Sequence, residues 1–244
     1  MGLADTIIIT CEHGGNSVPR EHARLMKPVR SMLATHRGFD PGALELAQDM
    51  AAAFRAPLHF STTTRLLVDL NRSPDASDVF GPSVKAAPPD SQRAILERFY
   101  LPYRRAVEAD VRSMVRRRNA GAHAKCTHIS VHSFTPVLRG KRRTVDIGLL
   151  FDPGRSRERA LADAWIAAMD LMDLGLRIRR NEPYKGTADG FTTHLRTLHP
   201  DQSYAGIEIE VNQRLVRSGG TRWLRVRGAL IAGLAIALET TRCG

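Results

Sequence analysis

Three stretches of the chain join apolar, mostly β-branched residues to an abrupt polar end. Residues 7–16 begin with three isoleucines and end on an acid, an imidazole, two glycines and an amide. Residues 129–133 place a second histidine at the end of a similar run, and residues 206–212 alternate apolar side chains with two glutamates. Buried strands of parallel sheets read as apolar runs, and open α/β sheets bind ligands beyond the carboxyl ends of their strands. We therefore expect these three strand ends to meet at one sheet edge.

Helical periodicity alternates with shorter strand patterns along the rest of the chain. Further strands are expected at 58–60, 65–70, 144–151 and, as an edge strand, 176–179, and helices at 41–54, 91–118 with a bend near Pro102, 158–174, 190–198 and 223–238. Residues 74–89 and 181–189 show neither period and predict long loops, which often cover functional sites. This alternation predicts an α/β protein, a three-layer α/β/α sandwich around a mixed, mostly parallel sheet, as a single domain over 1–244.

The helix expected at 41–54 has an explicit start signal. Asp40 is the expected N-cap, Pro41 suits the first helical position, and apolar residues follow at helical spacing up to Phe54. Because this helix follows the first strand, Asp40 is expected at the same sheet edge.

The bulk composition is that of a globular protein with a sizeable core. Of the 244 residues, 43% are hydrophobic and 25% are charged, a balance that excludes a disordered chain. No apolar run approaches a membrane span, and Met1–Asp5 lead into the first strand without the features of a secretion signal. A cytoplasmic protein without membrane contact is therefore expected.

The net charge of +11 raises the question of nucleic-acid binding. The basic residues are concentrated in short runs such as 116–118 and 141–143, and the 6% of aromatic residues do not interleave with them as in a base-stacking surface. We expect solvated helix faces and loops, no nucleic-acid partner, and some attraction of a small anionic substrate. A basic module that binds RNA or an acidic protein without catalysis is the alternative from another class.

The chain has three cysteines and no CxxC pair, which argues against a disulfide framework and against a cysteine-rich zinc site. Cys11 adjoins the candidate site, so a cysteine hydrolase that uses Cys11 and His13 is a further alternative. A small apolar residue that closes a strand is the favoured interpretation of Cys11.

Histidines at two strand ends indicate a metal site. Catalytic zinc needs a few nitrogen or oxygen ligands, an open position for water and a carboxylate near that water. His13 and His132 supply the imidazoles, and the third ligand is Asp40, Asn16 or Glu12. Asp40 ranks first because of its expected place at the sheet edge, whereas the neutral amide of Asn16 is a poor ligand.

Asn71 and Arg72 follow the strand expected at 65–70. A guanidinium binds a carboxylate with two hydrogen bonds, which suits capture of an acidic substrate. A structural ion pair with Asp69 or Asp75 is the alternative for Arg72.

Glu208 and Glu210 point the same way from their strand, since side chains alternate along a strand. Two acids on one face of an otherwise apolar strand predict that at least one of them is functional or paired with an arginine.

Several short segments, read in order, carry a family resemblance. They are CEHGGNSVP at 11–19, GFDPGA at 38–43, RLLVDLNR at 65–72, HSFTPVL at 132–138 and IEI at 207–209, and NEPY at 181–184 also fits. Together they resemble the N-formylglutamate amidohydrolase family, which is similar in fold and site layout to the zinc carboxypeptidases and the zinc-dependent cell-wall amidases.

The resemblance implies roles for seven residues. His13 and His132 are implied as zinc ligands with Asp40 as the third, Glu208 as general base and acid, and Arg72 with Asn71 as the binders of a substrate carboxylate. Ser133 lies in a segment that resembles the substrate- and zinc-binding part of the carboxypeptidases. Two positions depart from the pattern: the carboxypeptidases have Glu where Asn16 stands, and many relatives have Arg where Glu210 stands.

The function implied is that of a zinc-dependent amidohydrolase of N-acyl acidic amino acids. N-formyl-glutamate is the expected substrate, with formate and glutamate as products. Another N-acyl amino acid or a cell-wall peptide is the nearest alternative, and the acyl group and the oligomeric state are left open.

Overall fold

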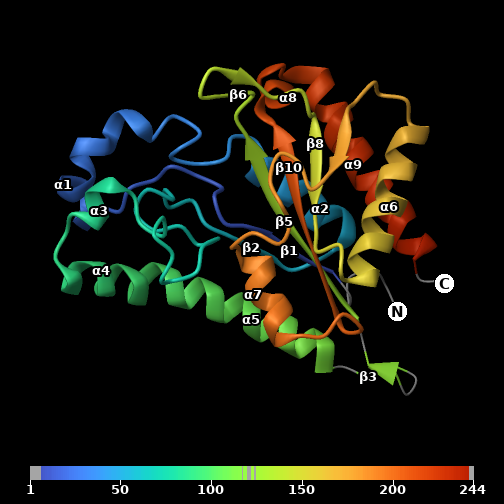
Figure 1. The fold of residues 1–244 in the computed structure, drawn as a ribbon, viewed down its shortest axis with the longest axis horizontal. Helices are drawn as coiled ribbons and strands as arrows, with labels where there is room; N and C mark the ends of the chain where they lie inside the picture. The colour runs from blue at the N-terminus through green and yellow to red at the C-terminus, as the bar shows by residue number, and fades with distance from the viewer. Residues whose placement is uncertain (1–6, 117, 120–121, 124, 242–244) are drawn as a thin grey trace.

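The computed structural model describes residues 7–116, 118–119, 122–123 and 125–241 (Figure 1). The expectations about Met1–Asp5, about the third cysteine, Cys243, and about the two ends of the domain at 1–244 lie outside the described residues.

A six-stranded sheet runs through the middle of the molecule (Figure 1). Its strands, in spatial order, are β2 (Leu58–Phe60), β1 (Ile7–Cys11), β5 (Cys126–Phe134), β10 (Tyr204–Asn212), β8 (Ile147–Leu150) and β9 (Ile178–Arg180). Every neighbouring pair is parallel except β10 and β8, which are antiparallel. The mixed, mostly parallel sheet expected from the sequence is therefore confirmed. Two short ribbons lie outside it, β3 (Arg118–Asn119) with β4 (Ala122–His123) and β6 (Val137–Leu138) with β7 (Lys141–Arg142).

Helices cover both faces of the sheet. One apolar cluster joins it to α2 (Ala43–Phe54), α6 (Ser156–Leu171) and α9 (Gly220–Thr240), and another joins its opposite face to α5 (Leu101–Arg116) and α7 (Phe191–Leu198). The α/β class and the three layers are as the sequence predicted. The other helical segments are η2 (Arg20–His22), α1 (Ala23–Met26), η3 (Lys27–Met32), α3 (Pro82–Lys85), α4 (Pro89–Ile95), η4 (Leu96–Tyr100) and α8 (Gln213–Arg217).

Because side chains alternate along each strand, the sheet has one apolar face and one face that carries buried polar groups. All nine residues of β5 are buried, and Ile129 and Val131 belong to the cluster with α2, α6 and α9. Ser130 and His132 therefore lie on the face covered by α5 and α7, because successive side chains of a strand point to opposite faces. The polar groups thus share one buried side of the sheet, close to the ends of its parallel strands.

The strand expected at 65–70 is wrong. Residues 65–72 form turns, and their apolar side chains pack in a separate cluster with α1, η3, α3, α4 and η4 instead of joining the sheet. The pattern misled because an apolar run of this length fits a buried turn-rich segment as well as a strand.

The start of α2 also differs from the expectation. Asp40 and Pro41 precede the helix, which begins at Ala43 after Gly42 in a left-handed conformation (φ 78°). A Cβ at Gly42 would lie 2.6 Å from the side chain of Val216, so the turn also has no room for a side chain at position 42. The Asp40 carboxylate is therefore free of the capping role predicted for it.

No helix within the described ranges is both long enough and apolar enough to cross a membrane.

Candidate metal site at the carboxyl edge of the sheet

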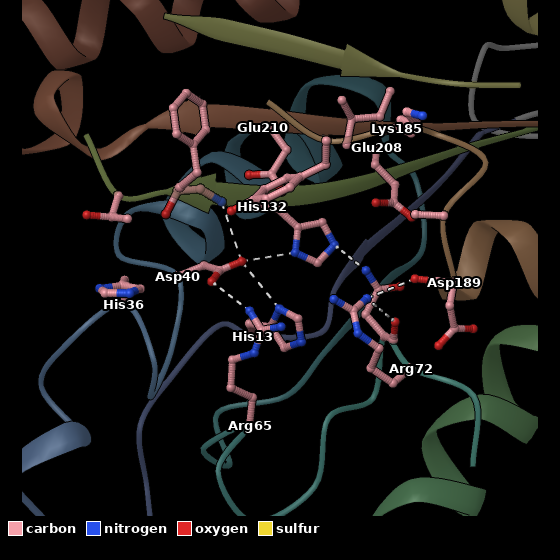
Figure 2. Close-up of a pocket in the computed structure, with 17 residues that line it drawn as sticks. His13, His36, Asp40, Arg65, Arg72, His132, Lys185, Asp189, Glu208 and Glu210 are labelled. Carbon is pink, nitrogen blue, oxygen red and sulfur yellow. Dashed lines mark hydrogen bonds and ion pairs between the residues drawn. The ribbon is translucent and has the colours of Figure 1, made fainter. Parts of the chain in front are cut away.

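A pocket of about 190 Å³ opens at the carboxyl ends of the parallel strands (Figure 2). It is lined by all seven residues to which the family resemblance gave roles, namely His13, Asp40, Asn71, Arg72, His132, Ser133 and Glu208. The strand ends therefore meet as expected.

His13 and His132 face one carboxylate from two neighbouring strands. His13 follows the end of β1 and His132 lies in β5, and their ring centroids are 5.0 Å apart. The Nδ1 atoms of His13 and His132 lie 3.3 Å and 3.0 Å from Oδ2 of Asp40 (Figure 2). Two residues far apart in the chain thus converge on the third.

The turn before α2 carries Asp40 to this position. Its backbone N–H donates to the carbonyl of His13 at 2.9 Å, and its own carbonyl accepts from Ala43 at 3.1 Å. The backbone around Asp40 is therefore tied to the end of β1 and to the first turn of α2, and its side chain points at both imidazoles.

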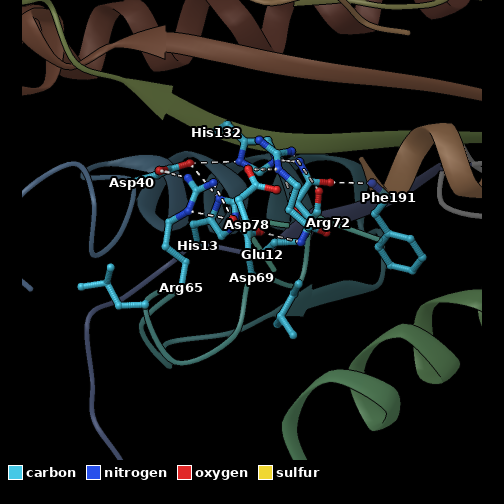
Figure 3. A network of polar contacts seen from close by, with 12 residues as sticks. Glu12, His13, Asp40, Arg65, Asp69, Arg72, Asp78, His132 and Phe191 are labelled. Carbon is cyan, nitrogen blue, oxygen red and sulfur yellow. Dashed lines mark hydrogen bonds and ion pairs between the residues drawn. The ribbon is translucent and has the colours of Figure 1, made fainter. Parts of the chain in front are cut away.

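The Nε2 atoms of both histidines have partners within the protein (Figure 3). Nε2 of His13 lies 2.7 Å from Oδ1 of Asp69. Nε2 of His132 lies 2.9 Å from the hydroxyl of Ser130, 3.4 Å from Oε2 of Glu12 and 3.3 Å from Nδ2 of Asn71. Histidines that bind metals characteristically use one nitrogen for the ion and give the other N–H to a carboxylate or another acceptor. The Nδ1 atoms are therefore the ring nitrogens that remain available to bind one metal ion together.

The two other candidates for the third ligand lie elsewhere. Glu12 is buried behind His132, where it also accepts a hydrogen bond from the hydroxyl of Tyr103 at 3.0 Å. The amide of Asn16 is exposed and donates to the carbonyl of Leu33 at 3.1 Å. Only Asp40 completes a group with the two histidines.

The electrostatics of this cluster favour a positive charge. Burial alone would raise the pKa of Asp40, but His13, His132 and Arg65 hold it well below its usual range. Burial likewise opposes protonation of His132, yet the hydrogen bonds and charges of Asp40 and Glu12 raise its pKa well above the ordinary value. Buried carboxylates that hold a proton on an imidazole provide the same negative field for a bound cation.

The donor set fits a divalent metal of the zinc type. The three ligand atoms, from His13, Asp40 and His132, lie within 4.8 Å of one another. Two atoms bonded to one tetrahedral zinc ion lie roughly 3.3 Å apart, given bonds of about 2.0–2.1 Å, which is close to the two Nδ1 to Oδ2 separations. Two imidazoles and one carboxylate are also a ligand set of catalytic zinc sites, with a fourth position left open.

Two glutamates border the cluster from β10. Glu208 reaches the pocket with its Oε1 atom held at 2.6 Å by the hydroxyl of Thr192. Glu210 stands opposite His132 in the strand register, and its buried Oε2 atom has no hydrogen-bond partner among the described residues. Burial, with Asp40 and Glu208 nearby, raises the pKa of Glu210 to about 8.

Arg72 lies on the other side of the pocket. Its Nε atom donates to Asp78 at 3.0 Å and its Nη1 atom to the carbonyl of Asp189 at 2.8 Å. The ion pair suggested as an alternative, with Asp69 or Asp75, is therefore formed with Asp78 instead. Asp69 binds Arg65, at 3.0 Å and 2.6 Å.

Ser133 and Cys11 offer little reactive chemistry where they lie. The hydroxyl of Ser133 donates to the carbonyl of Pro41 at 2.8 Å, which ties β5 to the turn that carries Asp40. Cys11 is fully buried in the cluster with α2, and burial with the charge of Glu12 raises the pKa of its thiol well above the ordinary value. A nucleophilic thiolate at Cys11 is therefore disfavoured.

Sequence reasoning missed the residues that hold the candidates in place. They are Arg65, Asp69, Ser130, Asp189 and Thr192. Ser130 alone had a usable signal, since it precedes His132 by two positions and so shares its face of β5.

Fold and site together define a three-layer α/β protein with a candidate metal site at the carboxyl edge of its sheet. The model of the N-formylglutamate amidohydrolase family matches residues 5–217, and the chain belongs to that family. The resemblance found in the sequence is confirmed.

Solved structures support the fold. The crystal structure of the gene product Atu2144 of Agrobacterium tumefaciens is similar, with a TM-score of 0.81 and 27% identity over 97% of this chain and 91% of that one. The N-formylglutamate amidohydrolase of Ralstonia eutropha JMP134 is similar in fold, with a TM-score of 0.67 and 18% identity over 98% of this chain and 96% of that one. No curated protein matches the chain in sequence.

Proposed function

We propose that this protein is a zinc-dependent amidohydrolase that cleaves N-formyl-glutamate or a closely related N-acyl acidic amino acid. Membership of the N-formylglutamate amidohydrolase family supports the reaction. The observation that carries the metal dependence is the buried group of His13, Asp40 and His132, whose ligand atoms lie within 4.8 Å of one another.

In this proposal His13, Asp40 and His132 hold the zinc ion. A bound zinc ion polarises the acyl carbonyl and lowers the pKa of water at the site to about 7. Asp69 and the pair of Ser130 and Glu12 fix the histidine rings so that both Nδ1 atoms face the ion.

Glu208 is the proposed general base and acid. It borders the same pocket as the histidines, with one carboxylate oxygen held by Thr192. Its carboxylate takes a proton from the attacking water and returns it to the leaving nitrogen, so that glutamate departs as an amine and the acyl group as formate.

Arg72 is the proposed binder of the substrate carboxylate. Its guanidinium borders the pocket opposite the metal cluster, and the hydrogen bonds described above occupy Nε and Nη1. Nη2 is directed to a carboxylate in the proposal, and Asn71 next to it orients the substrate. Holding the carboxylate end of the substrate fixes its acyl carbon over the metal cluster, so that binding energy is used to orient the substrate.

The proposal is tested by Glu208→Gln, assayed on N-formyl-L-glutamate with metal analysis of the same preparation. The variant is expected to keep the zinc content of the wild type and to lose nearly all hydrolysis. Unchanged turnover would refute the role of Glu208. A wild-type protein that binds RNA, contains no metal and hydrolyses nothing would favour the basic binding module instead.

A further inference from the structure

One short segment, Asp189–Thr192, contacts Asn71, Arg72 and Glu208. These are the pocket residues to which the proposed function assigns substrate binding or proton transfer. The segment leads from the loop at 181–190 into α7 and lies beside Arg72 and Glu208 (Figure 2).

Thr192 holds one oxygen of Glu208. The side chain of Thr192 is completely buried, and its hydroxyl donates to Oε1 of Glu208 at 2.6 Å. Within the described part of the chain, Oε2 of Glu208 has no hydrogen-bond partner. The contact therefore fixes the carboxylate plane while it leaves the second oxygen to the pocket.

Asp189 holds the loop that carries Arg72. Its carbonyl accepts from Nη1 of Arg72 at 2.8 Å, and its two carboxylate oxygens accept from the backbone N–H of Ser73 at 3.0 Å and from the Ser73 hydroxyl at 2.5 Å. Three bonds thus join residues 72–73 to this one residue across the pocket mouth.

The segment is anchored to the sheet between these two contacts. The ring of Phe191 is fully buried against α5, with the guanidinium of Arg104 4.0 Å from its centroid, and its N–H donates to Oδ1 of Asn71 at 2.6 Å. A Cβ at Gly190 would lie 3.0 Å from Oε1 of Glu208 and 3.3 Å from Oδ1 of Asn71. The glycine therefore lets the backbone approach both residues closely.

We propose that Asp189–Thr192 is the positioning segment of the site, in which Thr192 sets the carboxylate of Glu208 and Asp189 sets the guanidinium of Arg72. The inference rests on the proposed function of Glu208 and Arg72. It implies two separable effects, because an interaction that aligns the base acts on kcat and one that aligns the substrate binder acts on KM.

The first test is Thr192→Val, a substitution of nearly equal volume that removes the hydroxyl. On N-formyl-L-glutamate, kcat is expected to fall about 10- to 100-fold, since misplacement by about 1 Å can cost that much, while KM changes little. Thr192→Ser is expected to restore most of the lost kcat. Thr193→Val is the matched control, because the Thr193 hydroxyl donates to the carbonyl of Ala188 at 2.7 Å and not to Glu208. A wild-type kcat in Thr192→Val would overturn the role of Thr192.

The second test is Asp189→Ala, which removes both acceptors of Ser73. KM is expected to rise several-fold with kcat little changed. Asp189→Asn keeps one side-chain oxygen, so its KM is expected to lie between that of the wild type and that of Asp189→Ala. An unchanged KM in Asp189→Ala would overturn the role of Asp189.

Crystal structures of Thr192→Val and Thr192→Ser give a readout that needs no substrate. The Glu208 carboxylate is expected to leave its wild-type place in the valine variant and to keep it in the serine variant. If it moves in this way but the wild type does not hydrolyse N-formyl-glutamate, the positioning role stands and the proposed function fails. If the wild type is active and the carboxylate stays in place in both variants, the positioning role fails.

Discussion

Nε2 of His13 lies 2.7 Å from Oδ1 of Asp69, and this contact decides which nitrogen of His13 faces the pocket. A neutral imidazole has one N–H and one lone pair. Both carboxylates beside the ring can only accept, and the shorter contact to Asp69 favours an N–H on Nε2, which leaves the lone pair of Nδ1 for a metal ion shared with Asp40, 3.3 Å away. Asp69 thus sets the tautomer that a metal ion requires.

Asp69→Asn should weaken zinc binding about 10-fold, since losing the partner of a ligating histidine typically costs about 10- to 100-fold in affinity. The affinity is measured by competition with a chelator. Asp78→Asn is the matched control, because Asp78 is exposed and pairs with Arg72 rather than with a histidine. Equal affinities of Asp69→Asn and the wild type would contradict the role of Asp69.

Arg72→Lys should raise KM for N-formyl-L-glutamate about 10- to 100-fold, because a lysine ammonium cannot replace the bonds of Nε and Nη1 and still offer the substrate the hydrogen bond of Nη2, and a charged hydrogen bond contributes about 1.5–3 kcal/mol. Steady-state kinetics check this. The exposed Arg93, which pairs with Asp90 on α4, gives the control Arg93→Lys. A KM that does not respond to the substitution would remove Arg72 from the substrate site.

Glu210→Gln should stabilise the metal-free protein at pH 8. Burial raises the pKa of Glu210 from an ordinary 4.5 to about 8. The unfolded state therefore releases this proton first, and the folded state loses stability as the pH rises from about 4.5 to about 8. Glutamine has no proton to release.

Urea unfolding in the presence of EDTA at pH 5 and pH 8 measures this effect. The advantage of the Glu210→Gln variant should be small at pH 5 and grow toward pH 8. The same difference at both pH values would mean that the Glu210 carboxyl does not titrate as stated.

His128 should make the protein sensitive to acid. It lies on the polar face of β5, where the hydroxyls of Thr10 and Tyr204 each lie 2.8 Å from one of its ring nitrogens, and burial lowers its pKa from 6.5 to about 4. Below pH 6.5 the unfolded state takes up a proton that the folded state refuses, so stability falls until about pH 4. The loss from this group is roughly 3 kcal/mol.

The pH dependence of urea unfolding between pH 7 and pH 4.5 measures this loss. His128→Gln removes the titrating ring, so the variant should lose less stability over this interval than the wild type, whatever its stability at pH 7. Parallel curves for the two proteins would rule out His128 as a source of the acid sensitivity.

The strand ends that build the pocket could be predicted because their signal is local. Apolar runs that stop on His13 and His132, and the alternation that carries Glu208, are visible in the sequence and need only the topology of an α/β sheet to meet. That the chain forms a single domain over 1–244 stays a prediction.

The supporting contacts could not be predicted because they depend on how turns fold in three dimensions. Residues 65–70 were expected as a strand, and a strand there would not have placed Asp69 behind His13. Asp40 was expected to cap α2, and the left-handed turn at Gly42 instead presents its carboxylate to the histidines. Thr192 contacts Glu208 of β10 from the helix α7, and nothing in the local sequence marks that pairing.

The most direct measurement is a calorimetric titration of zinc into the metal-stripped protein, for the wild type and for His132→Ala. The wild type should bind one zinc ion tightly and recover hydrolysis of N-formyl-L-glutamate with it, whereas His132→Ala should lose that binding step. A stripped wild-type protein that takes up no zinc, or a His132→Ala variant that binds it as tightly as the wild type, would contradict a metal site formed by His13, Asp40 and His132.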